Sequence, residues 1–453
     1  MAELSSSWNQ PDGQSLGCHS SVTGQKLWRR ALDRIPGGSM LLSKRTEMLL
    51  PGGWPAYFER ASGCDVWDLD GNRYVDVGLM GVGTNILGYA HPKVNEAVRG
   101  AVEKGALSTL NAPEEVALAD RLCEITPWAE MVRFTRSGGE AGAVAVRIAR
   151  AATGKDVVAF CGYHGWHDWY LAANLADDDA LDGHLLPGLE PAGVPRALKG
   201  TARPFAYNDL AALQALLERG DVGVVMMEVE RSIPPAPGFL AGVRELTRKH
   251  GAVLIFDECT SGFRQVLGGH HQVHDVEPDI AVFGKTLGNG FAINAVVGRR
   301  EVMRAAERTF ISSTFWTERI GPTAALASLQ AMEEEDAPAR VHAIGLDVTA
   351  RWRAIAAANG LQLSIAGLPA VSSFTVDGRN APTIKAFVAH ALLAEGFLAT
   401  TALYASIAHE PSRLEPYYEA LDRVFATISA RSDDELAAQL PDGPSWTGFG
   451  RLA

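Results

Sequence analysis

The sequence predicts an α/β fold, with a mostly parallel sheet covered by helices on both faces and a second, smaller α+β domain. Two observations predict it. From about residue 110, apolar runs of strand length alternate with segments of helical spacing. After the charged stretch EEEDAPAR (333–340), the pattern changes to a mixture of helices and alternating strands. The length of 453 residues fits two or three domains.

The predicted strands of the sheet are short and almost wholly apolar, as strands buried on both faces are. Glycines end two of the helices between them. The strands are expected at 131–135, 156–161, 222–229, 252–258 and 279–284, and the helices at 114–125, 139–152, 210–220 and 238–251.

Four regions follow from these patterns. Residues 1–25 are rich in Ser, Gly and Gln and are expected to be a disordered tail, with order beginning near Leu27. Residues 26–100 contain a hairpin at 63–76 around Asp70-Gly71-Asn72 and are expected to pack with the small domain. Residues 101–335 form the large domain, and residues 336–453 the C-terminal small domain.

Composition excludes several classes of protein. Hydrophobic residues make up 47% and charged residues 21%, which excludes a disordered chain or a coiled coil. The net charge of 41 − 53 = −12 argues against nucleic-acid binding. No apolar run is long enough for a membrane span, and no signal segment is recognisable. Five scattered cysteines without a C-x-x-C pair fit a reducing cytoplasm.

Candidate site residues follow the predicted strands, because ligands of parallel sheets bind beyond the carboxyl ends of the strands. Ser137, Gly138 and Gly139 open a helix and could bind a phosphate through free N–H groups and a hydroxyl. The alternative is an ordinary turn with Ser137 as the N-cap. Tyr163, followed by His164, could stack on a planar ligand or be a core or surface aromatic.

Asp257 and Lys285 end two further strands. A buried carboxylate such as Asp257 could keep a heteroaromatic nitrogen protonated, or it could cap a turn or pair with Arg264. Lys285, in a glycine-rich setting, could form a Schiff base, or it could be a surface lysine. A nucleotide phosphate loop fails because Asp279 stands where its first glycine is required.

A histidine-rich segment is the remaining candidate. His270, His271, His274 and Asp275 have the residue types of a metal cluster, but no second cluster supports them and GGHHQVHD is typical of an exposed loop. No metal is therefore predicted. The other groups together (a phosphate cup, a stacking ring, a ring-nitrogen acid and a Schiff-base lysine) are those that pyridoxal 5'-phosphate requires.

An ordered set of motifs supports this cofactor. From about residue 27 to 430 the chain resembles the class III pyridoxal-phosphate aminotransferases of fold type I, in the branch of glutamate-1-semialdehyde aminomutase. The resemblance implies the seven-stranded sheet of that fold and a homodimer with shared sites. Its motifs are WDLDGNRYVD, GYAHP (88–92), SGGEA (137–141), YHG (163–165), IFDECTSGFR (255–264), FGKTLGNG (283–290) and FWTERIGPTAA (315–325).

The resemblance also implies roles for residues. Lys285 is similar to the Schiff-base lysine, and Asp257 to the partner of the pyridine nitrogen. Thr317, or Thr314 if the alignment slips, is similar to the threonine that reaches the phosphate of the neighbouring subunit. Arg45 is a candidate for a substrate carboxylate. The other residues expected at the cofactor are Ser137, Gly138, Gly139, Tyr163, His164, Glu228 and Cys259.

Departures from the motifs bear on the substrate. Gly139 replaces the usual threonine of the phosphate loop, Cys259 replaces a frequent valine, and Thr401 stands where aminomutases carry a glutamate. The stretch MEVERSIPP (227–235) also differs. We therefore expect an aminotransferase that uses an amino-acid donor, L-glutamate, and a sugar-derived or cyclic oxo acid, as do enzymes that make 8-amino-octulosonate or aminate dehydroshikimate. The alternatives are an aminomutase and a non-catalytic protein on this fold.

Overall fold

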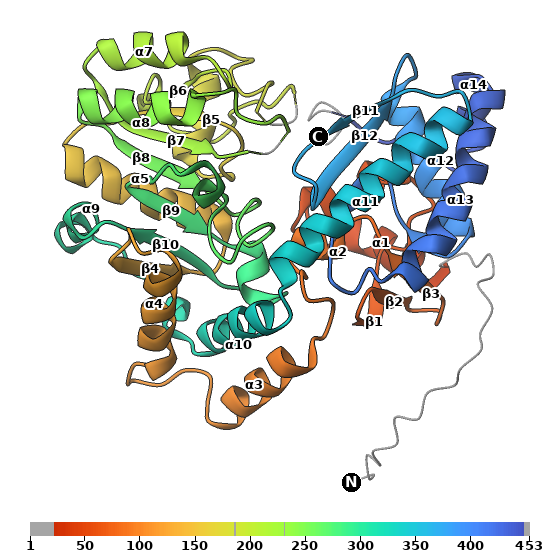
Figure 1. The fold of residues 1–453 in the computed structure, drawn as a ribbon, viewed down its shortest axis with the longest axis horizontal. Helices are drawn as coiled ribbons and strands as arrows, with labels where there is room; N and C mark the ends of the chain where they lie inside the picture. Colours follow the sequence, from red (N-terminus) through yellow and green to blue (C-terminus); the bar gives the residue numbers. More distant parts are fainter. Residues whose placement is uncertain (1–21, 185–186, 231, 448–453) are drawn as a thin grey trace.

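A seven-stranded sheet in the order β4-β10-β9-β8-β7-β5-β6 forms the centre of the larger part of the molecule (Figure 1). The computed structural model describes residues 22–184, 187–230 and 232–447. Strands β9, β8, β7, β5 and β6 are parallel neighbours, whereas β10 is antiparallel to β9 and β4. The strands span β4 Met131–Thr135, β5 Val157–Cys161, β6 Ala202–Pro204, β7 Val222–Glu228, β8 Val253–Asp257, β9 Ile280–Phe283 and β10 Asn294–Gly298.

The apolar runs are explained by burial on both faces of this sheet. Every residue of β5, β7, β8 and β9 is buried. Along β7, Val224 and Met226 belong to one apolar cluster and Val225 and Met227 to another. Successive side chains of a strand point to opposite faces, so β5, β7 and β8 contribute to both clusters. Strand β9 contributes Ile280 and Val282 to the first cluster and Ala281 and Phe283 to a third one.

Helices cover the two faces. Helix α5 (Gly138–Thr153) supplies Ala145 and Ile148 to the cluster that contains Val224. On the other face, α7 (Leu210–Glu218) and α8 (Phe239–His250) supply Leu213 and Val243 to the cluster that contains Val225. The predicted mostly parallel sheet with helices on both sides is confirmed.

The second part of the molecule combines the two ends of the chain. Its four-stranded sheet has the order β1-β2-β3-β13, and Val75 of β3 pairs in parallel with Phe397 of β13. Figure 1 shows the N-terminal strands beside the C-terminal helices. The predicted hairpin is confirmed as β2 and β3, and its sheet includes β13 from the C-terminal part of the chain. The end of the 26–100 region lies elsewhere, since α3 (Pro92–Glu103) packs against α10 (Ile320–Glu334). The strands span β1 Phe58–Ser62, β2 Asp65–Asp68, β3 Arg73–Asp76, β11 Leu363–Ala366, β12 Val371–Val376, β13 Phe397–Leu398 and β14 Ala402–Tyr404, and β11-β12-β14 form a third sheet.

Helix α1 (Val22–Leu32) begins earlier than the predicted start of order at Leu27. The Thr23 side chain and backbone N–H donate to the Asp70 carboxylate, and Trp28 Nε1 donates to Glu47 at 3.0 Å. Both contacts join residues distant in the sequence, so local composition does not reveal them. The expectation of disorder was wrong for residues 22–25, and residues 1–21 lie outside the described part of the chain.

The remaining helices connect and cover these sheets, and the long helix α11 runs diagonally across the small domain in Figure 1. In the described ranges, no helix is both long and apolar enough to cross a bilayer. The remaining α-helices are α2 Met80–Gly83, α3 Pro92–Glu103, α4 Pro113–Ile125, α6 Asp168–Leu171, α9 Arg300–Met303, α10 Ile320–Glu334, α11 Ala337–Ala358, α12 Ala381–Ala394, α13 Pro411–Ala430 and α14 Asp433–Ala437. The 3-10 helices are η1 Leu42–Lys44, η2 Thr46–Met48, η3 Ala172–Leu175, η4 Arg196–Leu198, η5 His270–His274, η6 Lys285–Gly288, η7 Arg304–Arg308 and η8 Thr314–Thr317.

Candidate active site

Polar side chains gather at the carboxyl ends of the central parallel strands. Glu228 at the end of β7 pairs in register with Asp257 at the end of β8. Tyr163 and His164 follow β5, and Lys285 follows β9. The sheet therefore brings together residues that lie more than a hundred positions apart in the sequence.

Lys285 lies on a strained turn directly after β9. Gly284 is extended, and Lys285 itself has φ 44°, in the left-handed region that residues with a Cβ rarely adopt. Its Nζ donates to Oγ1 of Thr260 at 2.6 Å, and the side chain is half-buried. Such strain is typical of functional positions, because surrounding contacts must enforce it. The turn holds the amine at the edge of the sheet beside the β8 end.

Asp257 is a buried carboxylate with two hydrogen-bonding neighbours, His164 and Cys259. His164 Nδ1 lies 2.9 Å from Oδ2 of Asp257, and the Cys259 N–H donates to Oδ1 at 3.1 Å. Burial would raise the pKa of Asp257, but the hydrogen bond and charge of His164 and the Cys259 donor lower it below its usual value. The group is therefore held as a carboxylate despite its burial.

His164 faces hydrogen-bond acceptors at both ring nitrogens. Its Nε2 lies 3.1 Å from the Cys161 carbonyl oxygen, which can only accept, and its Nδ1 faces the Asp257 carboxylate. His164 is thus held between the Asp257 carboxylate and the Cys161 carbonyl.

Glu228 holds the turn that carries Tyr163. Its Oε2 accepts from the Tyr163 N–H at 3.1 Å. Gly162 at this turn has φ 105°, and a Cβ there would lie 2.6 Å from Oε2 of Glu228, so only glycine fits. The Tyr163 ring itself is exposed in the single chain and packs edge-on against Tyr170.

The predicted phosphate turn is the N-terminus of α5. Ser137 is its N-cap: Oγ accepts from the Glu140 N–H at 3.4 Å, and Glu140 accepts from the Ser137 N–H at 3.0 Å. Ser137 is therefore the N-cap of α5, as the alternative interpretation of this turn proposed. The N–H groups of Gly138 and Gly139 lie in the first turn, where no intrahelical acceptor is available. They remain suited to bind an anion at the positive end of the helix.

Gly139 is covered by an aromatic pair that the sequence pattern did not reveal. A Cβ at Gly139 would lie 2.9 Å from Nδ1 of His167 and 3.3 Å from the Trp166 ring. The His167 ring therefore occupies the space of the side chain that the usual threonine would place here. Among the described residues, His167 Nδ1 is buried and has no hydrogen-bond partner. Burial lowers the pKa of His167 although the Glu140 and Asp168 charges oppose this.

Arg136, just before the turn, ties it to the segment that carries Thr317. Its Nη2 donates to the carbonyls of Trp316 at 2.9 Å and Glu318 at 2.8 Å, and Nε pairs with Oε1 of Glu318 at 2.9 Å. Thr317 Oγ1 donates to the Thr314 carbonyl at 2.8 Å, and both threonines are exposed. We call these contacts the Arg136 clamp. The sequence did not predict them, because Arg136 and the residues it binds lie 180 and 182 positions apart.

Cys259 and Arg45 complete the predicted set. Cys259 lies beside Asp257, and burial together with the Asp257 charge raises its thiol pKa well above the usual value, which the nearby Lys285 partly opposes. Arg45 joins η1 and η2 and its guanidinium packs over Gly37. Among the described residues, Arg45 makes no hydrogen bond or ion pair with Lys285 or Asp257, so its role stays a prediction.

The histidine-rich segment is not the exposed loop that the sequence predicted. His270 and His271 are buried on η5, whereas Asp275 is exposed. The reason is Glu258, whose carboxylate accepts from the backbone N–H groups of both histidines at 2.9 Å. These hydrogen bonds to the buried Glu258 keep the segment in the interior. The local sequence pattern does not indicate them, because Glu258 lies twelve and thirteen positions away.

Comparison with known proteins identifies the family. The family model of aminotransferase class-III matches residues 52–407. The chain belongs to the class III aminotransferase family. A 3-aminobutyryl-CoA aminotransferase of Cloacimonas acidaminovorans (strain Evry) is 33% identical over 76% of this chain and 81% of its own length. A glutamate-1-semialdehyde 2,1-aminomutase of Syntrophobacter fumaroxidans is 40% identical over 59% of this chain and 62% of its own length.

Solved structures agree with this assignment. The FumI protein of Sphingopyxis sp. MTA144, in its pyridoxal phosphate internal aldimine form, superposes with a TM-score of 0.82 at 25% identity and covers 91% of this chain and 100% of its own. An omega-transaminase of Sphaerobacter thermophilus gives 0.79 at 26% identity, covering 90% and 98%. This class III aminotransferase is thus an enzyme of fold type I that uses pyridoxal phosphate, and it acts on small amino and oxo compounds.

The residues present fit this cofactor. The Gly138 and Gly139 N–H groups and the orphaned His167 Nδ1 lie together at the positive end of α5, where a phosphate is stabilised. The buried carboxylate of Asp257 and the strained Lys285 end neighbouring strands of the same sheet edge. His164 and Cys259 bind Asp257, and Glu228 is its neighbour in strand register. Thr317 is connected to the phosphate turn through Arg136.

Proposed function

We propose that this enzyme transfers the amino group of an amino-acid donor, L-glutamate, to a sugar-derived or cyclic oxo acid. The convergence of Lys285, Asp257 and the α5 turn at one sheet edge carries the transamination chemistry. The acceptor class rests on the motifs around Tyr163 and Thr317. A relative named as an aminotransferase over 76% of this chain supports the transfer of an amino group between two substrates.

Pyridoxal phosphate supplies a ring that accepts the electron pair left when the Cα–H bond of the donor breaks. Asp257 holds a proton on the ring nitrogen, so that this electron pair is delocalised, and His164 keeps Asp257 ionised. Lys285 Nζ would take the α-proton and deliver it to the cofactor within the same half-reaction, and it would carry out this proton transfer in reverse when the oxo acid is the substrate. Thr260, 2.6 Å from Nζ, holds the amine in place between these events. Lys285, Asp257 and the cofactor-binding turn would therefore act together in a ping-pong cycle.

The phosphate site departs from its relatives at one donor. Where the family's usual threonine would offer a hydroxyl, we infer that His167 Nδ1 donates instead. The buried, unpartnered nitrogen beside Gly139 supports this. The neutral ring retains one N–H that can point at the anion.

A homodimer with shared sites is the assembly that we propose. The single chain exposes apolar side chains on the segments beside the phosphate turn, including Phe310 at 83%, Phe315 at 71% and Trp166 at 67%. Exposed apolar surface of this kind is typical of a protein interface. Thr317 lies two residues from Phe315. If a second copy packs on this surface, the Thr317 hydroxyl would reach the phosphate site of that copy.

The decisive experiment starts from the amine form of the purified enzyme. Candidate oxo acids are added singly, and return of the aldehyde-form absorbance reports an acceptor. We expect sugar-derived or cyclic oxo acids to react faster than simple 2-oxo acids, and L-glutamate to regenerate the amine form. Equal rates for all oxo acids would contradict the acceptor class.

An aminomutase is the second candidate, because several relatives carry that name at 37–40% identity. Such an enzyme needs no external donor. Omission of glutamate from a turnover assay therefore separates the two: we expect product formation to stop. Thr401, in place of the glutamate typical of aminomutases, supports the transfer reaction.

A lysine variant tests the chemistry itself. We expect Lys285→Ala to abolish turnover, because no other amine occupies the strained turn after β9. Borohydride reduction of the loaded enzyme followed by peptide mapping should label Lys285. Lys249→Ala, at the exposed end of α8, is the matched control and should keep full activity. Near-normal rates in Lys285→Ala, or labelling of another side chain, would refute the assignment.

A further inference from the structure

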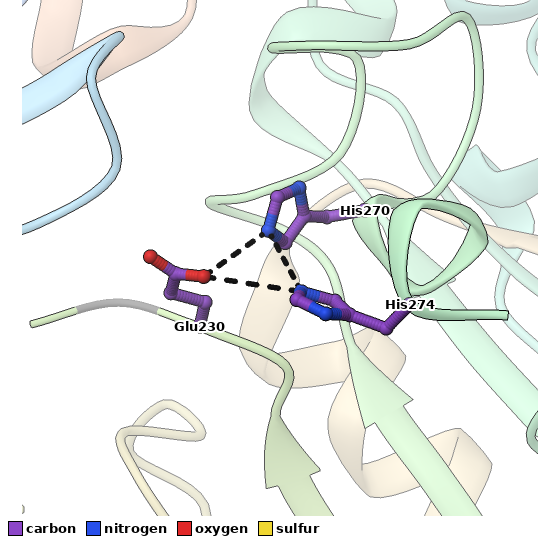
Figure 2. A group of neighbouring side chains, drawn as sticks. All are labelled: Glu230, His270 and His274. Atoms are coloured by element: carbon purple, nitrogen blue, oxygen red, sulfur yellow. Dashed lines mark hydrogen bonds and ion pairs between the residues drawn. The ribbon is translucent and has the colours of Figure 1, made fainter. Parts of the chain in front are cut away.

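Three potential metal ligands meet outside the aminotransferase site (Figure 2). Glu230 follows the end of β7, and His270 and His274 are the first and last residues of η5. His270 Nε2 lies 3.4 Å from Glu230 Oε2 and 3.4 Å from His274 Nε2. His274 Nε2 lies 3.9 Å from the same Glu230 oxygen. Figure 2 shows the three side chains pointing at one another from the two segments.

The separations match a metal site better than a set of hydrogen bonds. A ring nitrogen of neutral histidine carries either a proton or a lone pair, so protons cannot make all three contacts of this triangle favourable at once. A tetrahedral Zn²⁺ has bonds of about 2.0–2.1 Å to nitrogen and oxygen, which keep its ligand atoms about 3.3–3.4 Å apart. Two of the three distances already have this value. The third needs a shift of about half an ångström, within the reach of a glutamate side chain.

The scaffold of this cluster is fixed without any ion. The buried Glu258 carboxylate accepts from the His270 and His271 N–H groups and from His271 Nδ1, at 2.9, 2.9 and 2.8 Å. Trp128 Nε1 donates to His271 Nε2 at 2.9 Å, so both nitrogens of His271 are engaged and it is not a ligand. The start of η5 is thus anchored, and the ligands need little reorganisation to bind.

A metal ion could also reach these three side chains from solvent. The His270 side chain is only 4% exposed, whereas that of His274 is 25% exposed. One side of the triangle therefore reaches solvent, where a water molecule could complete the coordination. Two imidazoles and one carboxylate are ligands that Zn²⁺ and its transition-metal neighbours prefer over Mg²⁺ or Ca²⁺.

We propose that Glu230, His270 and His274 bind a divalent transition-metal ion, with Zn²⁺ as the best fit. The ion would join the segment after β7 to η5 and would stabilise that connection. It has no part in amino transfer, since the catalytic groups derived above do not include these three residues. The site is a structural or regulatory addition to the enzyme.

The test is metal binding by the cofactor-loaded enzyme. After treatment with a chelator and dialysis, the wild-type protein is titrated with Zn²⁺, and bound metal per chain is measured after desalting. We expect one equivalent, and a higher melting temperature with Zn²⁺ than without. Co²⁺ in place of Zn²⁺ should give the intense visible absorption of a tetrahedral site, at longer wavelengths than the cofactor band.

Two variants make the assignment specific. His274→Ala removes a ligand without touching the Glu258 anchor, and it should weaken Zn²⁺ binding by on the order of 100-fold. Asp275→Asn is the matched control, because this exposed neighbour at φ 53° loses its charge while asparagine tolerates the left-handed backbone. It should bind Zn²⁺ as the wild type does. Absence of Zn²⁺ and Co²⁺ binding to the wild type, or unchanged binding in His274→Ala, would overturn the proposal.

Discussion

Asp257 is buried, and burial by itself raises the pKa of a carboxyl group, yet the pKa of Asp257 is lowered. The hydrogen bonds from His164 and Cys259 offset the desolvation of the carboxylate. A carboxylate held in this state has one function that its burial explains, which is to stabilise a positive charge brought into the site. The adjacent Glu258 is also buried, but its carboxylate binds the start of η5.

The substitution Asp257→Asn tests this role. An amide cannot hold a proton on a ring nitrogen, so we expect the rate of each half-reaction to fall by a factor of 100 or more while the fold is kept. Stopped-flow absorbance measures the rates, and circular dichroism measures the fold. Asp275→Asn is the surface control. A loss of less than tenfold in Asp257→Asn would contradict the role.

Glu258 governs stability rather than chemistry. Burial would raise its pKa, but hydrogen bonds from His271 and Ser261 outweigh it and lower the pKa to about 2. A group with a lowered folded-state pKa stabilises the fold above its unfolded pKa, about 4.3, and loses this contribution as the pH falls toward the folded value. We expect Glu258→Gln to lower the free energy of unfolding at pH 7 by up to about 3 kcal/mol.

Urea unfolding at a series of pH values measures this difference. The gap between wild type and Glu258→Gln should be constant from pH 7 to about pH 5 and should narrow below that. Glu301→Gln, on the exposed start of α9, should leave stability unchanged within about 0.5 kcal/mol. If the difference in the free energy of unfolding between wild type and Glu258→Gln increased as the pH falls, a lowered pKa of Glu258 in the folded state would be contradicted.

At the scale of elements, the start of α5 would determine how a phosphate is held in the proposed site. The helix offers first-turn N–H groups, and the segment after β5 covers them with Trp166 and His167. Gly139 is therefore a consequence of the covering segment: a larger residue would collide with His167. The departure from the usual threonine and the presence of His167 are one structural feature.

A double substitution tests this connection. Gly139→Thr alone should weaken retention of the cofactor, because the new side chain displaces His167, and His167→Ala alone should weaken it by removing a donor. In Gly139→Thr/His167→Ala the threonine hydroxyl gains room, so we expect retention to recover by tenfold or more over either single variant. Equilibrium dialysis against pyridoxal phosphate measures the dissociation constants.

Gly100→Ala is the control for this series, because a Cβ at Gly100 of α3 meets nothing within 4 Å. It should leave cofactor affinity unchanged. Additive losses in the double variant would contradict the coupling of the two positions.

At the scale of the whole molecule, the segment that carries Thr317 is exposed in the single chain. Thr317 is exposed, its own chain uses its hydroxyl only toward the Thr314 carbonyl among the described contacts, and Arg136 fixes its segment to the phosphate turn. If a second copy packs on the apolar surface around Phe315, Arg136 would connect the phosphate turn of one chain to the Thr317 segment that reaches the site of the other chain. The proposed dimer thus explains the exposed aromatic residues and the clamp together.

Phe315→Asp tests the dimer. A charge on this apolar surface should convert the dimer to a monomer, measured by light scattering at the column outlet, and should weaken cofactor retention in parallel. Phe58→Asp, on an exposed β1 residue of the other part of the molecule, is the control and should stay dimeric. A monomeric wild type with full activity would contradict shared sites.

The sequence alone determined the strands, the helices between them and the residues at the strand ends. Burial on both faces makes parallel strands apolar throughout, and helix starts and stops have local signals, so nine of these elements were predicted close to their observed bounds. Lys285, Asp257 and the α5 turn were found in the same way, because each directly follows an element. Strands β6, which has only three residues, and β10 were not predicted from the sequence.

Only the tertiary structure decided which distant residues meet. Strand order places Glu228 beside Asp257, and a buried carboxylate draws in a segment that composition assigned to the surface. The pairing of His164 with Asp257, the Arg136 clamp and the approach of Glu230 to His270 all join segments separated by long stretches of chain. Such contacts follow from how elements pack against one another, and packing leaves no periodic trace in the sequence.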